Sequence, residues 1–123
     1  AALAAECRAD AAPASLHSIP TGASKEDHVP MAPVAVRKCR RILDNVRKVI
    51  GLELLCAAQG LDFLHPLRPG RGVAAAHACL RRSVPHLRRD RFLRPELALV
   101  TSSESPLPGR VLEAAERAAG PLL

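Results

Sequence analysis

The sequence predicts an all-α protein, with one long helix that residues outside this segment must cover, followed by short C-terminal helices. Three observations lead to this fold class. Apolar residues fill two adjacent heptad columns, which is the pattern of a broad apolar helix face. The apolar residues are mostly Ala, Leu and Val, with two Phe and no Trp or Tyr, a composition that suits close helix packing better than a β-sandwich. No segment shows the alternation of a strand. The two columns are Val36, Leu43, Ile50, Ala57, Leu64 and Ala35, Ile42, Val49, Cys56, Phe63.

Residues 1–32 are predicted to be a helix end and a connector. The Ala-rich segment 1–12 favours a helix, which Pro13 ends. Residues 15–22 form the connector. Ser24 is predicted to cap the next helix, because Asp27 three residues later completes a capping box. The connector and the cap contain most of the polar side chains that could take part in chemistry. These side chains either have only a capping role or face a cleft.

Residues 33–65 are predicted to be the long bundle helix, which could begin at Ser24 or at Pro33. Between residues 49 and 58 the only charge is Glu53, so this half is expected to be buried on most sides. Other subunits or a missing N-terminal part would have to cover it, and Glu53 would then need a partner. Cys39 and Cys56 lie on the apolar side and are interpreted as small core residues.

Residues 66–123 are predicted to form short C-terminal helices. Prolines and glycines between 66 and 72 indicate a loop, and a helix is expected over residues 73–84, ending near Pro85. A short segment starts at Arg94. After a turn at 102–108, the last amphipathic helix is expected over 108–119, with Val111, Leu112 and Ala115 on one side. His65, His77 and His86 are interpreted as isolated surface or packing residues.

Charge and cysteine content exclude several functional classes. The net charge is +6, concentrated in basic runs at residues 37–48 and 81–94. Phe92 is the one Phe, Trp or Tyr in these runs, too few for base stacking, so we expect a solvated face or a subunit contact and no nucleic-acid partner. The four cysteines lack zinc-ligand spacing, which predicts no metal and a reducing, cytoplasmic setting. No apolar run is long enough to span a membrane, so no membrane partner is expected.

Several short motifs carry a resemblance to a known family. They are Ala2-Leu3, Pro13-Ala14-Ser15, Ser18-Ile19-Pro20-Thr21, Glu26-Asp27-His28-Val29, Arg37-Lys38, Glu53-Leu54-Leu55 and Ala57-Ala58-Gln59. They match P-A-S-V-D-S-x-P-T-S-x-x-Q-E-D-H-V-S-M and a following helix with A-R-K and E-L-L-A-A-A-Q-x-L-D. The segment 90–97 is similar to the end of the same family. The chain therefore resembles the C-terminal part of the histidine ammonia-lyases, within the aromatic amino acid lyase family.

The resemblance implies an all-α homotetramer whose central bundle is built from the long helices of its subunits. These enzymes eliminate ammonia from L-histidine to give urocanate, and the resemblance puts residues 1–32 on the active-site side. Their electrophile is a methylidene-imidazolone made from Ala-Ser-Gly, a tripeptide absent from this chain, which also has no Tyr. We therefore expect a fragment of a lyase that is inactive alone, with the electrophile on a missing N-terminal part.

Glu26 is the one active-site residue that the resemblance assigns to this chain. It corresponds to the Glu of Q-E-D-H, and a carboxylate there would bind the imidazole of histidine. Lys25, Pro30 and His17 depart from the family pattern around it, and Pro30 and Pro33 would each remove a hydrogen bond from a helix that begins at Ser24. Two alternatives stay open: an inactive or truncated homologue used only for assembly, and a lyase or aminomutase for another aromatic amino acid.

Overall fold

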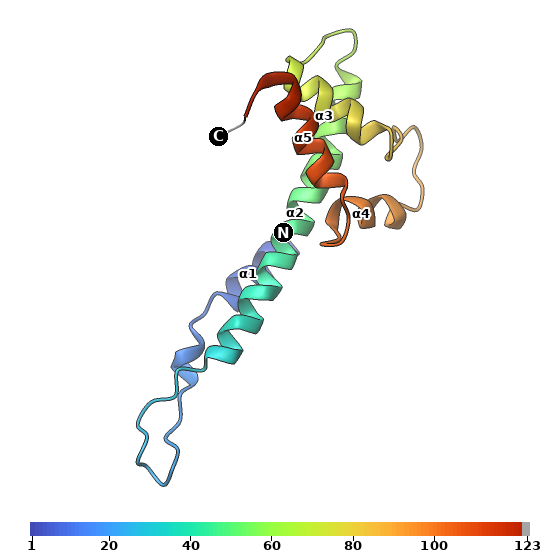
Figure 1. Ribbon diagram of the computed structural model, residues 1–123. Coiled ribbons are helices and arrows are strands. Elements are labelled where there is room, and N and C mark those ends of the chain that lie inside the picture. Colours follow the sequence, from blue (N-terminus) through green and yellow to red (C-terminus); the bar gives the residue numbers. More distant parts are fainter. Residues whose placement is uncertain (122–123) are drawn as a thin grey trace. The chain divides into compact units, whose positions relative to one another are not determined.

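The computed structural model describes residues 1–121 and consists of helices joined by loops (Figure 1). The α-helices are α1 (Ala2–Asp10), α2 (Ala32–Phe63), α3 (Arg71–Arg81), α4 (Arg94–Thr101) and α5 (Leu107–Ala119), and a short 3-10 helix, η1, covers Ala14–His17. Within residues 1–121 no strand forms, and Thr21 and Glu26 make an isolated antiparallel bridge. The all-α prediction is confirmed. None of these described helices combines the length and apolar character needed to cross a membrane.

The chain divides into two compact units, residues 1–46 and the residues from Arg47 onward, and α2 contributes to both. In the first unit, α1 lies antiparallel to the start of α2. Asn45 is buried and donates from Nδ2 to the Glu6 carboxylate at 2.9 Å, while Arg41 Nε donates to Asp10 Oδ2 at 2.9 Å. Lys38 donates to the carbonyl of Ala12. Basic residues of the run 37–48 therefore hold α1 in place.

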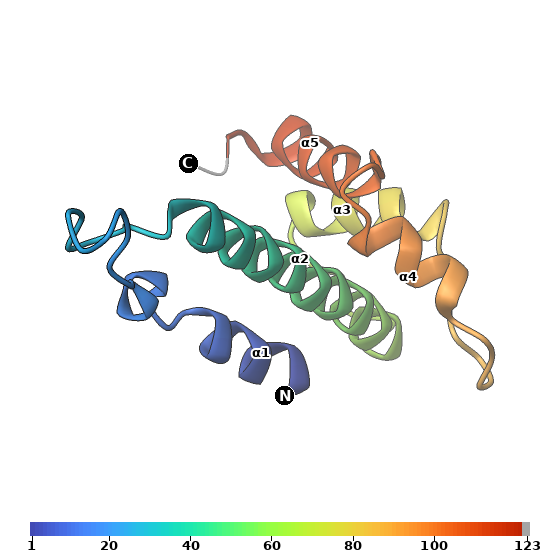
Figure 2. The ribbon, with the colours of Figure 1, turned by 90° about the horizontal axis from the view of Figure 1, so that it is seen from below.

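The second unit has a small aliphatic core between the end of α2 and the three C-terminal helices. Leu80 of α3 is fully buried at its centre, and α3 lies beside α5 (Figure 2). Small residues allow α3 and α5 to approach closely. A Cβ added at Gly72 of α3 would lie 3.0 Å from the Cβ of Ala119 in α5. The buried cluster is Ala58, Cys79, Leu80, Val84, Val100, Leu107 and Val111.

Several residues that were predicted to be buried are exposed in this chain by itself. Cys39 and Cys56 are exposed, and Cys56 lines an apolar cavity instead of packing in the core. Glu53 is also exposed, so solvent satisfies it without a buried partner. In α5, Val111 and Ala115 are buried, but Leu112, which was predicted on the same side, is half-exposed. Leu107, one turn before Val111, is buried as well. Helix α3 ends before Val84, which packs into the core from the following turn.

The two apolar columns of α2 remain largely uncovered. The column of Val36, Leu43, Ile50, Ala57 and Leu64 is exposed at every position, with Val36 at 67% and Ile50 at 59% of full exposure. In the neighbouring column only Ile42 is partly covered. Exposed apolar side chains that share one helix face in this way are typical of an interaction surface.

Candidate functional site

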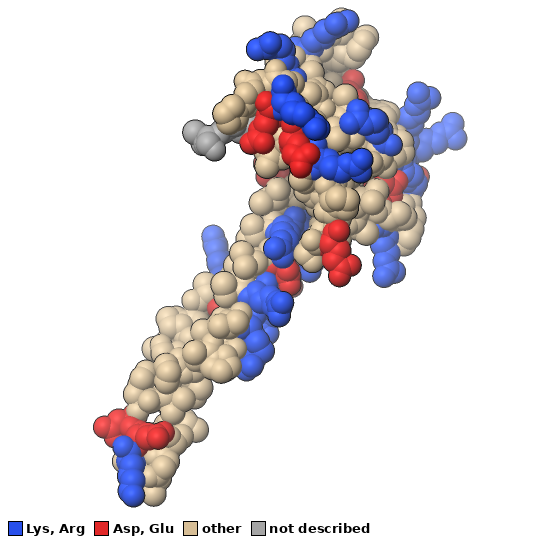
Figure 3. Space-filling model, in the orientation of Figure 1, with Lys and Arg blue, Asp and Glu red and all other residues tan. Residues whose placement is uncertain are grey.

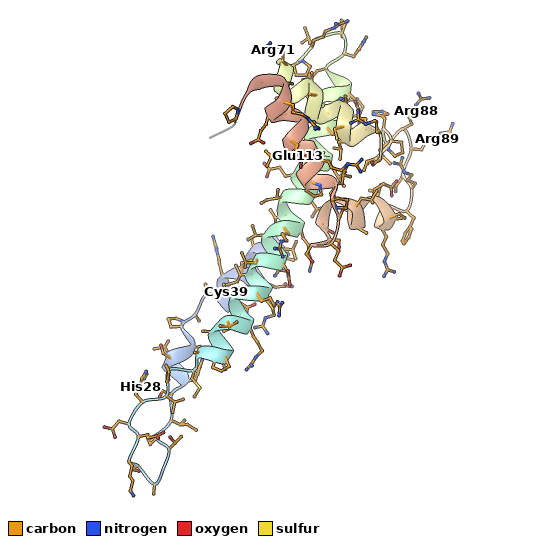
Figure 4. All side chains as sticks on the ribbon, in the orientation of Figure 1. His28, Cys39, Arg71, Arg88, Arg89 and Glu113 are labelled. Carbon is orange, nitrogen blue, oxygen red and sulfur yellow. The ribbon has the colours of Figure 1, made fainter. Side chains whose placement is uncertain are left out.

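The loop between η1 and α2, residues 18–31, carries most of the candidate functional residues. It extends from the end of the first unit, and Figure 3 shows a small group of acidic and basic side chains on it. Lys25, Glu26, Asp27 and His28 are all exposed on this loop, and His28 is labelled there in Figure 4. His17 lies outside it, at the end of η1, where it is exposed. The loop thus gathers Glu26 with its neighbours but leaves His17 separate.

Two sets of hydrogen bonds close the loop. At its base, the amide of Val29 donates to Ser18 Oγ at 2.8 Å. Further out, Thr21 and Glu26 exchange backbone hydrogen bonds, with N···O distances of 3.1 and 3.3 Å. A third contact joins the same pair, since the Thr21 hydroxyl donates to Glu26 Oε2 at 2.7 Å. The loop is therefore a short hairpin that fixes the backbone on both sides of residues 22–25.

The turn at residues 22–25 contains residues in the left-handed region. Gly22, Ala23 and Ser24 have φ of 60°, 55° and 67°, and the Lys25 amide donates to the Gly22 carbonyl at 3.2 Å. Positive φ at both central residues is typical of a type I′ turn, which normally uses Asn and Gly. Ala23 and Ser24 each carry a steric cost of about 1–2 kcal/mol in this region. Such strain is often found at functional sites.

The predicted capping box does not form. Ser24 lies in the strained turn, and α2 begins only at Ala32, so neither Ser24 nor Asp27 caps it. The predicted effect of the prolines is wrong for the same reason. Pro30 precedes the helix, and Pro33 occupies its first turn, where a missing N–H removes no helical hydrogen bond. The amides of Val34 and Ala35 instead both donate to the Met31 carbonyl at 3.0 Å.

Glu26 is exposed to solvent, and one of its two carboxylate oxygens accepts a hydrogen bond. Oε2 accepts from Thr21, and within residues 1–121 no ion pair joins Glu26 to Lys25. Oε1 stays free to accept a second hydrogen bond. An ionised carboxylate has up to four acceptor positions, so this group can receive the N–H of an imidazole or pair with an imidazolium.

A second polar cluster lies in the other unit, around Asp62 near the end of α2. Asp62 Oδ1 accepts from His77 Nε2 at 2.8 Å, and Oδ2 accepts from His86 Nδ1 at 2.7 Å and contacts an Arg81 terminal nitrogen at 2.7 Å. Partial burial acts to raise the pKa of Asp62, but hydrogen bonds from His86, Arg81 and His77 outweigh it and lower that pKa. The description of His77 and His86 as isolated residues is therefore wrong.

Gln59, one turn before Asp62, fixes the orientation of this cluster. Its Oε1 accepts from the Leu87 amide and its Nε2 donates to the Leu87 carbonyl, both at 3.1 Å. Gln59 Nε2 also lies 3.4 Å from His86 Nε2, so the same amide group contacts both Leu87 and His86. The sequence contained one signal for this cluster: Gln59 and Asp62 are spaced to share one face of an otherwise apolar helix segment.

An apolar cavity of about 400 Å³ lies beside this cluster in the second unit. Leu52, Cys56 and Phe63 of α2 line one side, and Leu87 and Leu97 line the other. Gln59 and Arg81 reach its wall from the Asp62 cluster. The exposed Arg88 and Arg89 extend from the loop between α3 and α4 (Figure 4). No group of His, Cys, Asp and Glu side chains in residues 1–121 is arranged to hold a metal ion.

Residues 1–82, which include the hairpin, all of α2 and α3, match the family described as aromatic amino acid lyase. The chain belongs to the aromatic amino acid lyase family. A histidine ammonia-lyase of Deinococcus radiodurans is 54% identical over 97 residues, which is 79% of this chain and 18% of that protein. One from Sorangium cellulosum is 47% identical over 110 residues, or 89% of this chain and 21% of that protein.

A solved structure agrees with this lyase assignment. The crystal structure of histidine ammonia-lyase from Trypanosoma cruzi is similar with a TM-score of 0.84 and 34% identity, over 94% of this chain and 23% of that chain. The chain thus spans about a fifth of the length of the lyases it matches. Because the family match begins at residue 1, it includes the strained hairpin and Glu26 as well as the long helix.

Proposed function

We propose that the chain is the C-terminal segment of a histidine ammonia-lyase, an enzyme that eliminates ammonia from L-histidine to give urocanate. In this role Glu26 binds the imidazole of the substrate. The observation that carries the proposal is the strained hairpin, which holds one carboxylate with a free oxygen inside the segment that matches the lyase family. The names of the relatives support histidine as the amino acid.

Elimination breaks the Cα–N bond, removes a proton from Cβ and forms the double bond of urocanate. The family's methylidene-imidazolone supplies the electrophile for this reaction, but this chain lacks the residues to form it. Its two Ala-Ser pairs, at Ala14 and Ala23, are followed by Leu16 and Lys25 instead of Gly. We infer that the group is carried by a part of the lyase outside these residues, and that this segment contributes binding of the substrate side chain.

Glu26 suits that contribution because of its chemistry and its orientation. Its free Oε1 can accept the imidazole N–H, while Oε2 stays bound to Thr21. A hydrogen bond to an ionised carboxylate is stronger than one between neutral groups, so this contact favours a substrate with an N–H donor over an apolar aromatic one. Histidine has such a donor in its ring, and phenylalanine does not.

Self-association is the second part of the proposal. The exposed apolar stripe on α2 supports burial against other copies of the lyase, with four subunits expected from the resemblance.

The four free cysteines support the cytoplasm as the compartment, because thiols stay reduced there.

Glu26→Gln in the full-length lyase that carries this segment tests the role of Glu26. We expect kcat/KM for histidine, measured by urocanate absorbance, to fall by about tenfold or more, because the amide makes a weaker and differently oriented hydrogen bond. Glu113→Gln is the control, since Glu113 is an exposed acid on α5 far along the chain from the hairpin (Figure 4).

Other outcomes separate the competing functions. Unchanged histidine turnover in Glu26→Gln would remove this residue from the substrate site. Turnover of another aromatic amino acid but not of histidine by the unmodified enzyme would indicate a different lyase or an aminomutase. Absence of turnover with every aromatic amino acid, in a chain that assembles, would indicate a homologue that serves only in assembly.

A further inference from the structure

Among residues 1–121, Thr21 is the one residue whose side chain hydrogen-bonds to the Glu26 carboxylate. Its oxygen lies 2.7 Å from Glu26 Oε2, within the usual range for a hydroxyl that donates to a carboxylate. The two residues are also the bridged pair of the hairpin, joined by backbone hydrogen bonds of 3.1 and 3.3 Å. Three hydrogen bonds therefore link Thr21 to the same residue, two fixing its backbone and one fixing its carboxylate.

This arrangement solves a physical problem of an exposed glutamate. A free Glu side chain samples many rotamers, and ordering it when a ligand binds costs conformational entropy. Thr is β-branched, so its χ1 is restricted and its hydroxyl points in a defined direction once the backbone is fixed. A hydroxyl held in this way orients Oε2 in advance, and it leaves Oε1 without a hydrogen bond from the described residues.

The rest of the loop supports the same function. Ser18 closes the base of the loop through the Val29 amide, and the strained turn at residues 22–25 reverses the chain between the bridged residues. Both features fix the backbone of Thr21 relative to Glu26, and neither contacts the carboxylate. Lys25, the nearest cation along the chain, makes no ion pair with Glu26 among the described residues. The orientation of the carboxylate thus depends on Thr21.

We propose that Thr21 is the positioning residue for Glu26, holding its carboxylate in the orientation that receives the N–H of the substrate's heteroaromatic ring. The inference rests on the proposed function of Glu26 and extends it to a residue that touches no substrate itself. Thr21 acts by ordering the free carboxylate before substrate arrives, so its contribution appears in substrate binding. It also favours substrates with a ring N–H donor, because only those use the oriented oxygen.

The test uses Thr21→Val and Thr21→Ser in the full-length lyase, with kcat and KM for histidine measured from urocanate formation. Val has the shape of Thr without the hydroxyl, and Ser keeps the hydroxyl. We expect Thr21→Val to raise KM by about tenfold with a small change in kcat, because loss of ground-state binding appears in KM. Thr21→Ser should stay within about threefold of the unmodified enzyme, since it retains the donor.

A double-mutant cycle with Glu26→Gln separates positioning from a general structural role. If Thr21 acts through the carboxylate, Thr21→Val should change KM by less than about twofold in the Glu26→Gln background. An equal loss in both backgrounds would show that Thr21 only supports the loop, and would overturn the proposal. Should Thr21→Val fail to assemble, as judged by light scattering, Thr21→Ala takes its place in the same cycle.

The outcomes also distinguish this proposal from the proposed function. A loss of histidine turnover in Glu26→Gln with no change in Thr21→Val overturns the role of Thr21 and leaves that of Glu26. Unchanged turnover in Glu26→Gln overturns both. Equal impairment by Thr21→Val and Thr21→Ser would exclude the hydroxyl as the active group and would also overturn the positioning role.

Discussion

At the scale of single residues, the carboxylates of Glu26 and Asp62 differ in how many partners they have within the chain. Glu26 has one partner and a free oxygen, so it can bind something outside the hairpin. Asp62 contacts His77, His86 and Arg81, so both of its oxygens are engaged by residues of the second unit. Asp62 joins α2, α3 and the loop after α3, which makes it a structural group.

The lowered pKa of Asp62 gives a prediction about stability and pH. A carboxyl with a pKa below its ordinary value of 3.8 stabilises the fold above that pH, and the contribution is lost as pH falls through the lower folded pKa. Asp62→Asn should therefore lower the free energy of unfolding by about 2 kcal/mol at pH 7. Denaturant unfolding of the 123-residue chain, followed by circular dichroism, measures this difference.

The same experiment across pH checks the mechanism. Protonation of Asp62 removes the same charge that Asp62→Asn removes. The difference in free energy of unfolding between the unmodified chain and Asp62→Asn should therefore shrink below pH 3.8. Asp90→Asn is the matched control, since Asp90 is exposed in the loop after α3. A difference that stays constant down to pH 2 would mean that packing, and not the charge of Asp62, is responsible.

At the scale of elements, the second half of α2 depends on how closely α4 approaches it. Gly51 is buried in α2, and a Cβ added there would lie 2.6 Å from the Val100 carbonyl oxygen at the end of α4. That contact is backbone, so it cannot move away as a flexible side chain would. A Cβ added at Gly60, on the same helix, would have no neighbouring atom within 4 Å.

These two glycines form a matched pair of substitutions. Gly51→Ala should destabilise the chain by about 2 kcal/mol or more, because α4 must shift away from α2. Gly60→Ala should stabilise it by about 0.5–1 kcal/mol, since Ala is the better helix former and nothing opposes it. Thermal unfolding of both variants tests the pair, and equal melting temperatures would contradict the close approach.

At the scale of the whole molecule, the main feature is the apolar stripe that no described part of the chain covers. Val36 and Leu43 carry it in the first unit, and Ile50 and Ala57 carry it in the second. Burial of apolar surface contributes about 25 cal/mol per Å², so several such side chains supply a substantial drive to associate. The stripe follows a single helix, which suits packing against further helices.

We expect charges in the stripe to weaken self-association. Leu43→Glu together with Ile50→Glu should shift the chain toward smaller species in sedimentation velocity, because an unpaired charge is costly to bury in an interface. Leu67→Glu is the control, since Leu67 is an exposed leucine outside the stripe. A monodisperse monomer before any substitution would contradict the assembly proposal itself.

Much of the helical architecture could be predicted because it depends on local properties. Heptad spacing in residues 35–64 located α2. The prolines and glycines near 66–70 located its end, and those near 66–70 and 102–108 located the later helices. The start of α2 could not be settled in this way. Ser24 and Asp27 satisfy the capping pattern, but the bridge between Thr21 and Glu26 holds that segment in a hairpin instead.

The sequence by itself determined that the chain is helical, that α2 has one broad apolar face, and that Glu26 is the residue to examine. Periodicity and motifs contain that information because they involve neighbours along the chain. Only the tertiary structure decided which residues surround each carboxylate, since the hydroxyl of Thr21 and the rings of His77 and His86 reach their partners through chain reversals. Those contacts depend on where the turns bring the backbone, which no local pattern specifies.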